Sequence, residues 1–232
     1  MTTCPEVRST PAGVLFDLDG TLVDTAPDLV AALNLALAEH SYSSVLLEQV
    51  RHAASHGSMA LVRAAQPHLD ESFALALQQT LLRHYEIING QHCRLFEGIP
   101  ALLDALTSAG IPFGIVTNKA ARFARPLIER LAMSNVSSLI SGDSSIRSKP
   151  DSAPMLLAAS QLNCDPADIF YLGDAKRDMD AAKASGMTAV LANWGYFGLN
   201  DNPDAWPYDL RLACPLELLN YLSHDLWCNS EG

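Results

Sequence analysis

The sequence has 232 residues, of which 49% are hydrophobic and 18% charged, and this balance is typical of a globular chain and not of a disordered one. Its formal net charge of −11 argues against a surface for nucleic acid or anionic membrane, because both need clustered Lys and Arg. The five cysteines form no Cys-x-x-Cys pair, which predicts free thiols in a reducing compartment. With no signal-like or membrane-spanning apolar run, we expect a cytoplasmic protein without nucleic-acid or membrane partners.

The first expected element is a buried strand at residues 13–16, "GVLF", because this short apolar run is followed by turn chemistry. From residue 27 onward the pattern becomes helical. Pro27 suits the start of a helix, apolar residues recur at helical spacing, and Asn89-Gly90 is a good stop for the last helix. We therefore predict an all-helical insert over about residues 24–92.

From residue 96 the pattern alternates between strands and helices. Strands are expected at 111–117, 136–141, 168–173 and 187–192, and helices at 100–110, 120–132, 151–162, 176–186 and near 215–222. Alternation of this kind implies parallel strands joined by helices that cover both faces of one sheet. The predicted fold class is thus α/β, with a core of residues 1–23 and 93–232 interrupted by the helical insert.

Polar side chains follow four of these chain segments at the point where the apolar run ends. In an open parallel sheet the ligand crevice lies outside the carboxyl ends of the strands, so these side chains should converge there. Carboxylates gathered so closely must be neutralised, and hard oxygen ligands suit a cation such as Mg²⁺. The residues are Asp17 and Asp19 in "FDLDGT", Thr117 and Asn118 in "VTNK", Lys149 in "SKP", and Asp174 and Asp178 in "LGDAKRD".

Each signal also has a purely structural interpretation. Asp-x-Asp-Gly is often a turn, Asn118 could cap the helix that follows it, and Lys149 could be a solvated loop lysine. A calcium-binding loop that starts at Asp17 is excluded, because Leu22 stands where that loop needs glycine. The occurrence of all four signals in order, each at a predicted strand end, favours a functional site.

These four motifs in this order resemble the signature motifs of the haloacid dehalogenase superfamily, and the likeness covers nearly the whole chain. The resemblance implies a Rossmann-like parallel sheet, a mobile helical cap formed by the insert, a Mg²⁺ cofactor and an aspartyl-phosphate intermediate. It also implies an enzyme, a phosphoric monoester hydrolase.

The same resemblance assigns roles to individual residues. Asp17 would be the nucleophile, and Asp19 would protonate the leaving oxygen and later deprotonate the attacking water. Mg²⁺ would be held by the carboxylates of Asp17 and Asp174 and by the backbone carbonyl of Asp19, with Asp178 acting beside the metal. Phosphate would be bound by Thr117, Asn118 and Lys149.

Other chemistries of the superfamily can be weighed on the same residues. Asp19 argues against a dehalogenase, since halide leaves without a proton, and the absence of lysine from the insert argues against phosphonate cleavage. A sugar-phosphate mutase stays open. A non-catalytic binding protein is disfavoured, because every group that the reaction needs is present.

Within the superfamily the chain is most similar to the phosphoglycolate phosphatases, through "FDLDGTLVDTAPDL", "GIPFGIVTNKAARFARPLIERL" and "GDAKRDMDAAKASGM". The segment "NWGYFGLNDNPDAW" also resembles the N-acetylmuramic acid 6-phosphate phosphatases. The expected activity is Mg²⁺-dependent hydrolysis of a small phosphorylated metabolite of carbohydrate metabolism. Phosphoglycolate is the first candidate and N-acetylmuramic acid 6-phosphate the alternative, and the enzyme is expected to be a monomer or homodimer.

Substrate choice should lie in the insert, because the core residues meet only phosphate and metal. The amides at Gly57 and Ser58 and the side chain of Arg63 are candidates for meeting a substrate carboxylate, although Arg63 could equally be a surface residue. Histidines His52 and His56 are one helical turn apart and could share a metal, but solvated or capping roles are favoured.

Overall fold

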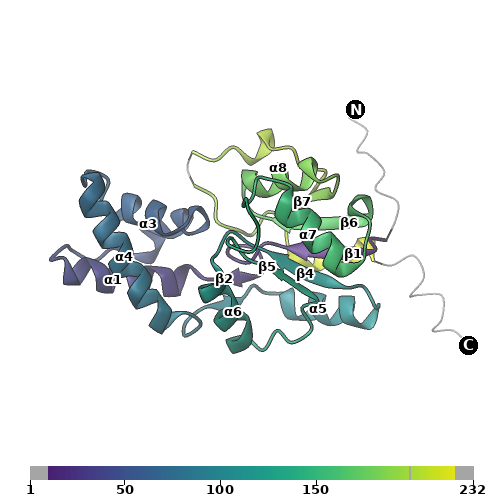
Figure 1. Ribbon diagram of the computed structural model, residues 1–232, viewed down its shortest axis with the longest axis horizontal. Coiled ribbons are helices and arrows are strands. Elements are labelled where there is room, and N and C mark those ends of the chain that lie inside the picture. The colour runs from purple at the N-terminus through teal and green to yellow at the C-terminus, as the bar shows by residue number, and fades with distance from the viewer. Residues whose placement is uncertain (1–9, 199, 223–232) are drawn as a thin grey trace, which may run out of the picture.

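The computed structural model describes residues 10–198 and 200–222 of the chain (Figure 1). At its centre lies a six-stranded sheet in the order β5-β4-β1-β6-β7-β8, and every neighbouring pair is parallel. The predicted α/β, Rossmann-like fold is therefore confirmed. The strands are β1 (Gly13–Phe16), β4 (Phe113–Val116), β5 (Ser138–Ile140), β6 (Ile169–Gly173), β7 (Thr188–Ala192) and β8 (Leu210–Leu212).

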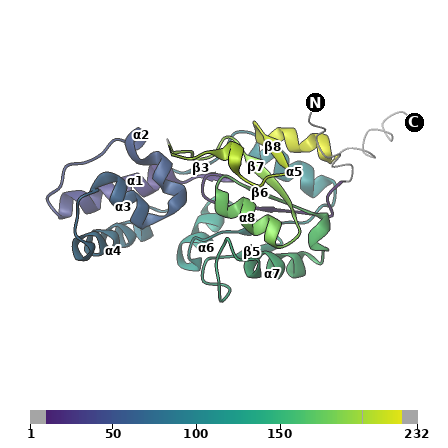
Figure 2. The ribbon, with the colours of Figure 1, turned by 90° about the horizontal axis from the view of Figure 1, so that it is seen from above.

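Helices cover both faces of this sheet (Figure 2). Side chains alternate along β1, so that Val14 and Phe16 pack with helices α5 (Ile99–Ser108) and α6 (Ala121–Arg130). Leu15 points to the other face, where α7 (Ala153–Leu162) and α8 (Lys176–Ala184) lie. Because both faces are buried, the central strands are apolar at every position, and polar chemistry is confined to the loops at their ends.

Between β1 and α5 the chain forms a separate helical body, which we call the insert (residues 26–88, at the left of Figure 1). Its core includes Leu33, Leu37, Leu77 and Leu81, all fully buried, and α4 packs against both α1 and α3. Its elements are α1 (Ala26–Glu39), α2 (Leu47–Val50), the 3₁₀ helix η1 (Arg51–His56), α3 (Ser58–Ala65) and α4 (Glu71–Ile88).

Two anchored chain crossings join the insert to the sheet. Strands β2 (Val23–Asp24) and β3 (Arg94–Leu95) form an antiparallel pair at the junction. The buried carboxylate of Asp28 accepts hydrogen bonds from the main-chain amides of Gly90, His92 and Cys93 at 2.7, 2.8 and 3.3 Å. A carboxylate that accepts several amides holds the returning chain close to the start of α1.

Several elements differ from the sequence prediction, among them the short strands β2 and β3. Strand β8 was not expected, because "LRL" is too short to display a strand period. The last expected helix is instead the 3₁₀ helix η4 (Pro215–Tyr221). Residues 51–56 also form a 3₁₀ helix rather than an α-helix, and it ends at Gly57, whose φ of 88° suits glycine.

Cys93, Cys164 and Cys214 are free thiols, as predicted, whereas Cys4 and Cys228 lie outside the described residues, as do the outer ends of the expected core. Within residues 10–198 and 200–222, no helix combines the length and the apolar character needed to cross a membrane.

Candidate active site

The register of the central strands brings three of the predicted motifs together. Phe16, the last residue of β1, pairs with Ile115 of β4 on one side and with Leu172 of β6 on the other. The main-chain amide of Asp17 continues the ladder by donating to the carbonyl of Leu172 at 2.8 Å. Residues that follow these strands therefore emerge at one edge of the sheet, the carboxyl edge predicted to hold the ligand.

Asp17 lies directly beyond β1 and is only 2% exposed. Its Oδ1 accepts a hydrogen bond from the Leu18 amide at 2.7 Å and pairs with Lys149 Nζ at 2.9 Å. Within the described part of the chain, no hydrogen bond holds Oδ2. Burial raises the pKa of Asp17, although Lys149 opposes this. The carboxylate thus has one oxygen fixed by the protein and one available at the wall of a cavity.

Asp174 follows β6 and is fully buried. Its Oδ2 accepts hydrogen bonds from Ser55 Oγ at 2.7 Å and from the Tyr196 amide at 2.9 Å. Its Oδ1 is buried without any hydrogen-bond partner among the described residues. Burial, together with the charges of Asp178 and Asp17, raises the pKa of Asp174 to about 7. A buried carboxylate oxygen without a donor is unfavourable, so this position needs a cation or a proton.

Lys149 and Asp178 form a buried pair beside these two carboxylates. Lys149 Nζ lies 2.7 Å from Asp178 Oδ1 and donates to the hydroxyl of Tyr171 at 2.7 Å. Asp178 Oδ2 accepts from the Ala175 amide at 3.0 Å, at the start of α8. Burial would raise the pKa of Asp178, but Lys149 and Arg177 overcome it and lower the pKa. Since the protein engages both oxygens of Asp178, this side chain stands beside the metal position rather than on it.

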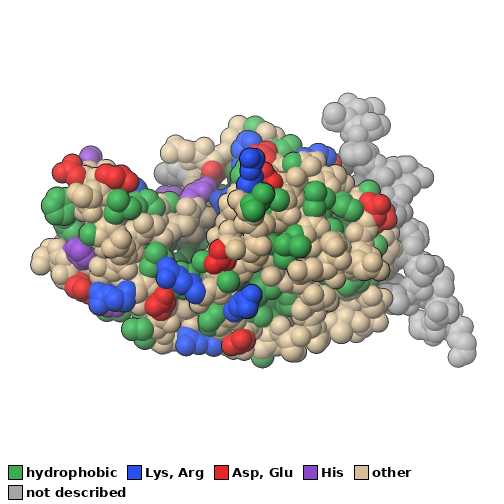
Figure 3. All heavy atoms as spheres, in the orientation of Figure 1, with side chains coloured by type: hydrophobic (Ala, Val, Ile, Leu, Met, Phe, Trp, Pro, Cys, Tyr) green, Lys and Arg blue, Asp and Glu red, His purple; other side chains and the backbone are tan. Residues whose placement is uncertain are grey.

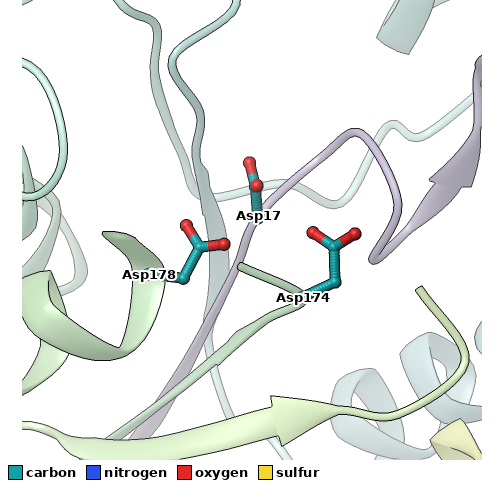
Figure 4. A group of neighbouring side chains, drawn as sticks. All are labelled: Asp17, Asp174 and Asp178. Atoms are coloured by element: carbon teal, nitrogen blue, oxygen red, sulfur yellow. The ribbon is translucent and has the colours of Figure 1, made fainter. Parts of the chain in front are cut away.

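The three carboxylates fit a small divalent cation. One oxygen each of Asp17, Asp174 and Asp178 lies within 4.8 Å of the others, and the three groups surround one space (Figure 4). Asp174 Oδ1 has no hydrogen-bond donor among the described residues, and Lys149 and Arg177 supply two positive charges against three carboxylates. Hard oxygen ligands in this arrangement suit Mg²⁺ or a similar ion, and Asp17 and Asp174 are the residues that could hold it.

Thr117 and Asn118 follow β4 at the same edge of the sheet, but their side chains have different hydrogen-bond partners. Thr117 is 3% exposed, and its Oγ1 accepts from the Lys119 amide at 3.1 Å at the cavity wall. Asn118 donates from Nδ2 to the carbonyl of Lys149 at 2.9 Å and accepts at Oδ1 from the Lys149 amide at 3.0 Å. Both ends of its amide therefore contact the main chain of Lys149. Asn118 also lines the cavity, and its contact with phosphate stays a prediction. It does not cap α6, which begins at Ala121.

Asp19 has a partner that the sequence analysis missed. Lys119 Nζ lies 2.8 Å from Asp19 Oδ1, which also accepts from Thr25 Oγ1 at 2.5 Å. The same ammonium group stands 4.8 Å from the centre of the Tyr85 ring, on α4 of the insert. Burial alone would lower the pKa of Lys119, but Asp19 and Tyr85 together raise it. A signal was available, since lysine is scarce in the chain and this one directly follows Thr117-Asn118.

A cavity of about 460 Å³ separates the sheet edge from the insert. In Figure 3 the surface is hollowed where these two parts of the molecule meet. Core residues, among them Asp17, Asp19 and Thr117, form one wall, and the opposite wall belongs to the insert. That opposite wall includes Leu29, Ser55, His56, Gly57, Ser58, Leu82 and Tyr85.

The insert residues predicted to choose the substrate divide into two groups. Gly57 and Ser58 line the cavity, at the start of α3. Arg63 does not, because it turns away to bind the carbonyl of Leu69 and the carboxylate of Glu71. These contacts favour the surface interpretation of Arg63, and its role in substrate choice stays a prediction. His56 is also a cavity residue, and burial together with Arg177 lowers its pKa, so that its ring is neutral at pH 7.

His52 and His56 do not form a metal site with carboxylates or thiolates. Among the described residues, the group of possible metal ligands found is the one formed by Asp17, Asp174 and Asp178. His52 lines a neighbouring cleft beside Tyr196 and Asp201. The favoured interpretation of these histidines, with solvated or capping roles, stays a prediction.

Comparison with known protein families shows to which family the chain belongs. The family model for haloacid dehalogenase-like hydrolases matches residues 14–192. The chain belongs to this family. The match extends from β1 to the end of β7, so it includes all four motifs and the insert.

Curated relatives cover nearly the whole chain. A phosphoglycolate phosphatase of Xanthomonas campestris pv. campestris (strain 8004) is 39% identical over 209 residues, which are 90% of this chain and 95% of the relative. An N-acetylmuramic acid 6-phosphate phosphatase of Pseudomonas aeruginosa PAO1 is 40% identical over 219 residues, which are 92% and 95% of the two chains. The predicted enzyme class, a phosphatase of the haloacid dehalogenase-like family, is confirmed.

Solved structures agree on the fold. The crystal structure of a predicted phosphoglycolate phosphatase from Haemophilus somnus 129PT has a TM-score of 0.82 and 24% identity, over 93% of this chain and all of the other. At this identity the likeness concerns the fold alone. It places the helical insert within an architecture that other haloacid dehalogenase-like proteins also adopt.

Proposed function

We propose that this phosphatase is a Mg²⁺-dependent phosphomonoester hydrolase that acts through a phosphorylated Asp17. The observation that carries the proposal is that two carboxylate oxygens, one of Asp17 and one of Asp174, lack a hydrogen-bond donor among the described residues. Among the described residues, Asp17 Oδ2 has no hydrogen-bond donor and its residue lines the cavity, and Asp174 Oδ1 is buried without a partner. One is free to attack a substrate, and the other is free to help hold the cation that an attack on a phosphate dianion requires.

In the first step Asp17 Oδ2 forms a bond to phosphorus while the bond between phosphorus and the leaving oxygen breaks. Asp19 gives the departing oxygen a proton, so an alcohol leaves. In the second step a water attacks the same phosphorus, Asp19 takes its proton, and the bond from Asp17 to phosphorus breaks. Free phosphate and the original Asp17 result, so one side chain serves both proton transfers.

The other core residues stabilise charge and hold the geometry. In this proposal the charge of Lys149 offsets that of the transferred phosphoryl group and the Thr117 hydroxyl donates to one of its oxygens, while Asn118 fixes the main chain of Lys149. When bound between Asp17 and Asp174, Mg²⁺ would reduce the repulsion between the carboxylates and the substrate. Asp178 keeps Lys149 in place through their 2.7 Å contact.

The insert acts in this proposal as the cap predicted for residues 24–92. It supplies one wall of the cavity and can exclude water when it closes over a bound substrate. Its two crossings to the core, at β2 and β3, are where such a motion would be absorbed. Substrate choice then falls to the insert residues, since the core wall meets only phosphate and metal.

Phosphoglycolate is the first substrate candidate, and relatives that carry this name are 39% identical over nine-tenths of the chain. N-acetylmuramic acid 6-phosphate is the second, and a specific observation favours it. The cavity of about 460 Å³ and its apolar residues Leu29, Leu82 and Phe123 suit a substrate larger than a two-carbon acid.

A phosphate-release assay over a panel of phosphorylated metabolites tests the proposal. The panel includes both candidates, with and without Mg²⁺, and compares their kcat/KM values. We expect the enzyme to release phosphate from a phosphomonoester without any activator, and to lose this activity when the metal is chelated. A requirement for a bisphosphate activator would instead indicate a mutase, and no turnover of any phosphomonoester would contradict the proposal.

A further inference from the structure

Ser55 is the one insert residue among those described whose side chain hydrogen-bonds to a candidate metal ligand. It stands in the 3₁₀ helix η1 and is 9% exposed. Its Oγ donates to Asp174 Oδ2 at 2.7 Å, across the boundary between the insert and the sheet. The sequence analysis gave this serine no role.

The same residue is tied to the core a second time through its main chain. Arg177 Nη2, on the first turn of α8, donates to the carbonyl oxygen of Ser55 at 2.6 Å. Both contacts reach the segment that contains Asp174 and Asp178. These two contacts therefore fix the position of η1 relative to Asp174 and to the start of α8.

The surroundings leave little freedom for this arrangement. Gly20, whose φ is 82°, has no room for a side chain, because a Cβ there would lie 2.1 Å from Asp174 Oδ2 and 2.9 Å from Ser55 Oγ. The Tyr196 amide holds the same Oδ2 from another side at 2.9 Å. With Oδ2 held by two donors, the carboxylate is oriented so that its unpartnered Oδ1 is the atom presented to a cation.

We propose that Ser55 is a positioning residue for the metal site, through which the insert orients Asp174 and sets the affinity for Mg²⁺. The inference rests on the proposed function, since it needs a metal at Asp174. Groups that orient a ligand carboxylate from outside typically change metal affinity by about 10–100-fold. Because this orienting group belongs to the insert, metal binding and docking of the insert must favour each other to the same extent.

The test is calorimetric titration of the purified full chain with Mg²⁺ alone, without substrate. Ser55→Ala should weaken Mg²⁺ binding by about 10–100-fold, and Ser55→Thr, which keeps the hydroxyl, should restore most of the affinity. Ser185→Ala is the matched control. Ser185 is also 9% exposed and its hydroxyl also donates, to the carbonyl of Ala181 at 2.7 Å, but it lies at the far end of α8. Its loss should leave Mg²⁺ affinity unchanged.

Hydrogen exchange gives the reciprocal measurement. Mg²⁺ should slow exchange of the amides of residues 51–56 in the wild type and have much less effect in Ser55→Ala. Equal Mg²⁺ affinity in the wild type and Ser55→Ala would overturn the inference and leave the proposed function intact. Failure of the wild type itself to bind Mg²⁺ would instead overturn the metal part of the proposed function, and the inference with it.

Discussion

The core wall and the insert wall of the cavity are built in different ways. On the core wall Asp17 and Thr117 stand at the ends of strands whose pairing register fixes their spacing, and each is at most 3% exposed. On the insert wall, residues such as Leu29 and His56 come from separate helices with their own small core. From this difference we infer that the core catalyses a reaction common to all phosphomonoesters and that the insert selects the substrate.

The largest effect is expected from the core wall. Asp17→Asn should reduce turnover by a factor on the order of 10⁶ on every phosphomonoester, because an amide cannot act as the nucleophile. The measurement is steady-state phosphate release from the selected substrate and from an aryl phosphate, with thermal unfolding as the control for folding. Near-normal turnover by this variant would remove the covalent mechanism from the account.

Asp19→Asn should cost roughly 10²–10⁴-fold on an alkyl phosphate, the usual range for acid–base catalysis. An aryl phosphate with a good leaving group needs less help from a proton in the first step, so its loss should be smaller. Lys119→Met should reproduce part of this pattern, because Lys119 holds Asp19 Oδ1 at 2.8 Å. Equal losses on both kinds of substrate would show that Asp19 does not protonate the leaving group.

Asp174→Asn should abolish stabilisation by Mg²⁺. The folded-state pKa of about 7 lies above the ordinary value of 3.8, so this group disfavours folding of the metal-free protein increasingly as pH rises from about 4 to 7. The variant should therefore be more stable than the wild type without metal at pH 8. In the wild type, Mg²⁺ should raise the melting temperature more at pH 8 than at pH 6, since protons compete with the cation. Scanning calorimetry at the two pH values checks both; no difference would contradict the assignment of Asp174.

The smallest effect, and the most selective, is expected from the insert wall. His56→Ala should lower kcat/KM for the preferred substrate by about tenfold, while changing hydrolysis of a generic aryl phosphate much less. Arg63→Ala is the matched control in the same insert, since this arginine binds Leu69 and Glu71 outside the cavity. A similar loss of kcat/KM in both variants, or an equal loss on both substrates, would contradict the proposal that the insert wall selects the substrate.

The sequence was most informative where function coincides with a strand end. Asp17, Thr117 and Asp174 could be predicted to converge because parallel strands end at one edge, and the structure places them there. The sequence does not reveal that the Asn118 amide also contacts the main chain of Lys149, because only the fold brings these two residues close together.

The insert wall could be predicted only in part. Its helical character followed from apolar spacing, but the orientation of each helix depends on tertiary packing. Residues 51–56 form a 3₁₀ helix, in which side chains do not follow α-helical spacing. Ser55 and His56 line the cavity, whereas Arg63 does not. No local pattern indicated the contact between Ser55 and Asp174, which joins residues 119 positions apart.

Chemical trapping of the covalent intermediate tests the central claim most directly. The enzyme is mixed with substrate and Mg²⁺, quenched during turnover, treated with borohydride to reduce any acyl phosphate, and digested for mass spectrometry. The account predicts conversion of Asp17 to homoserine in the peptide that carries it, and no such product without substrate. Turnover with an unmodified Asp17, or with the reduced residue at another position, would contradict it.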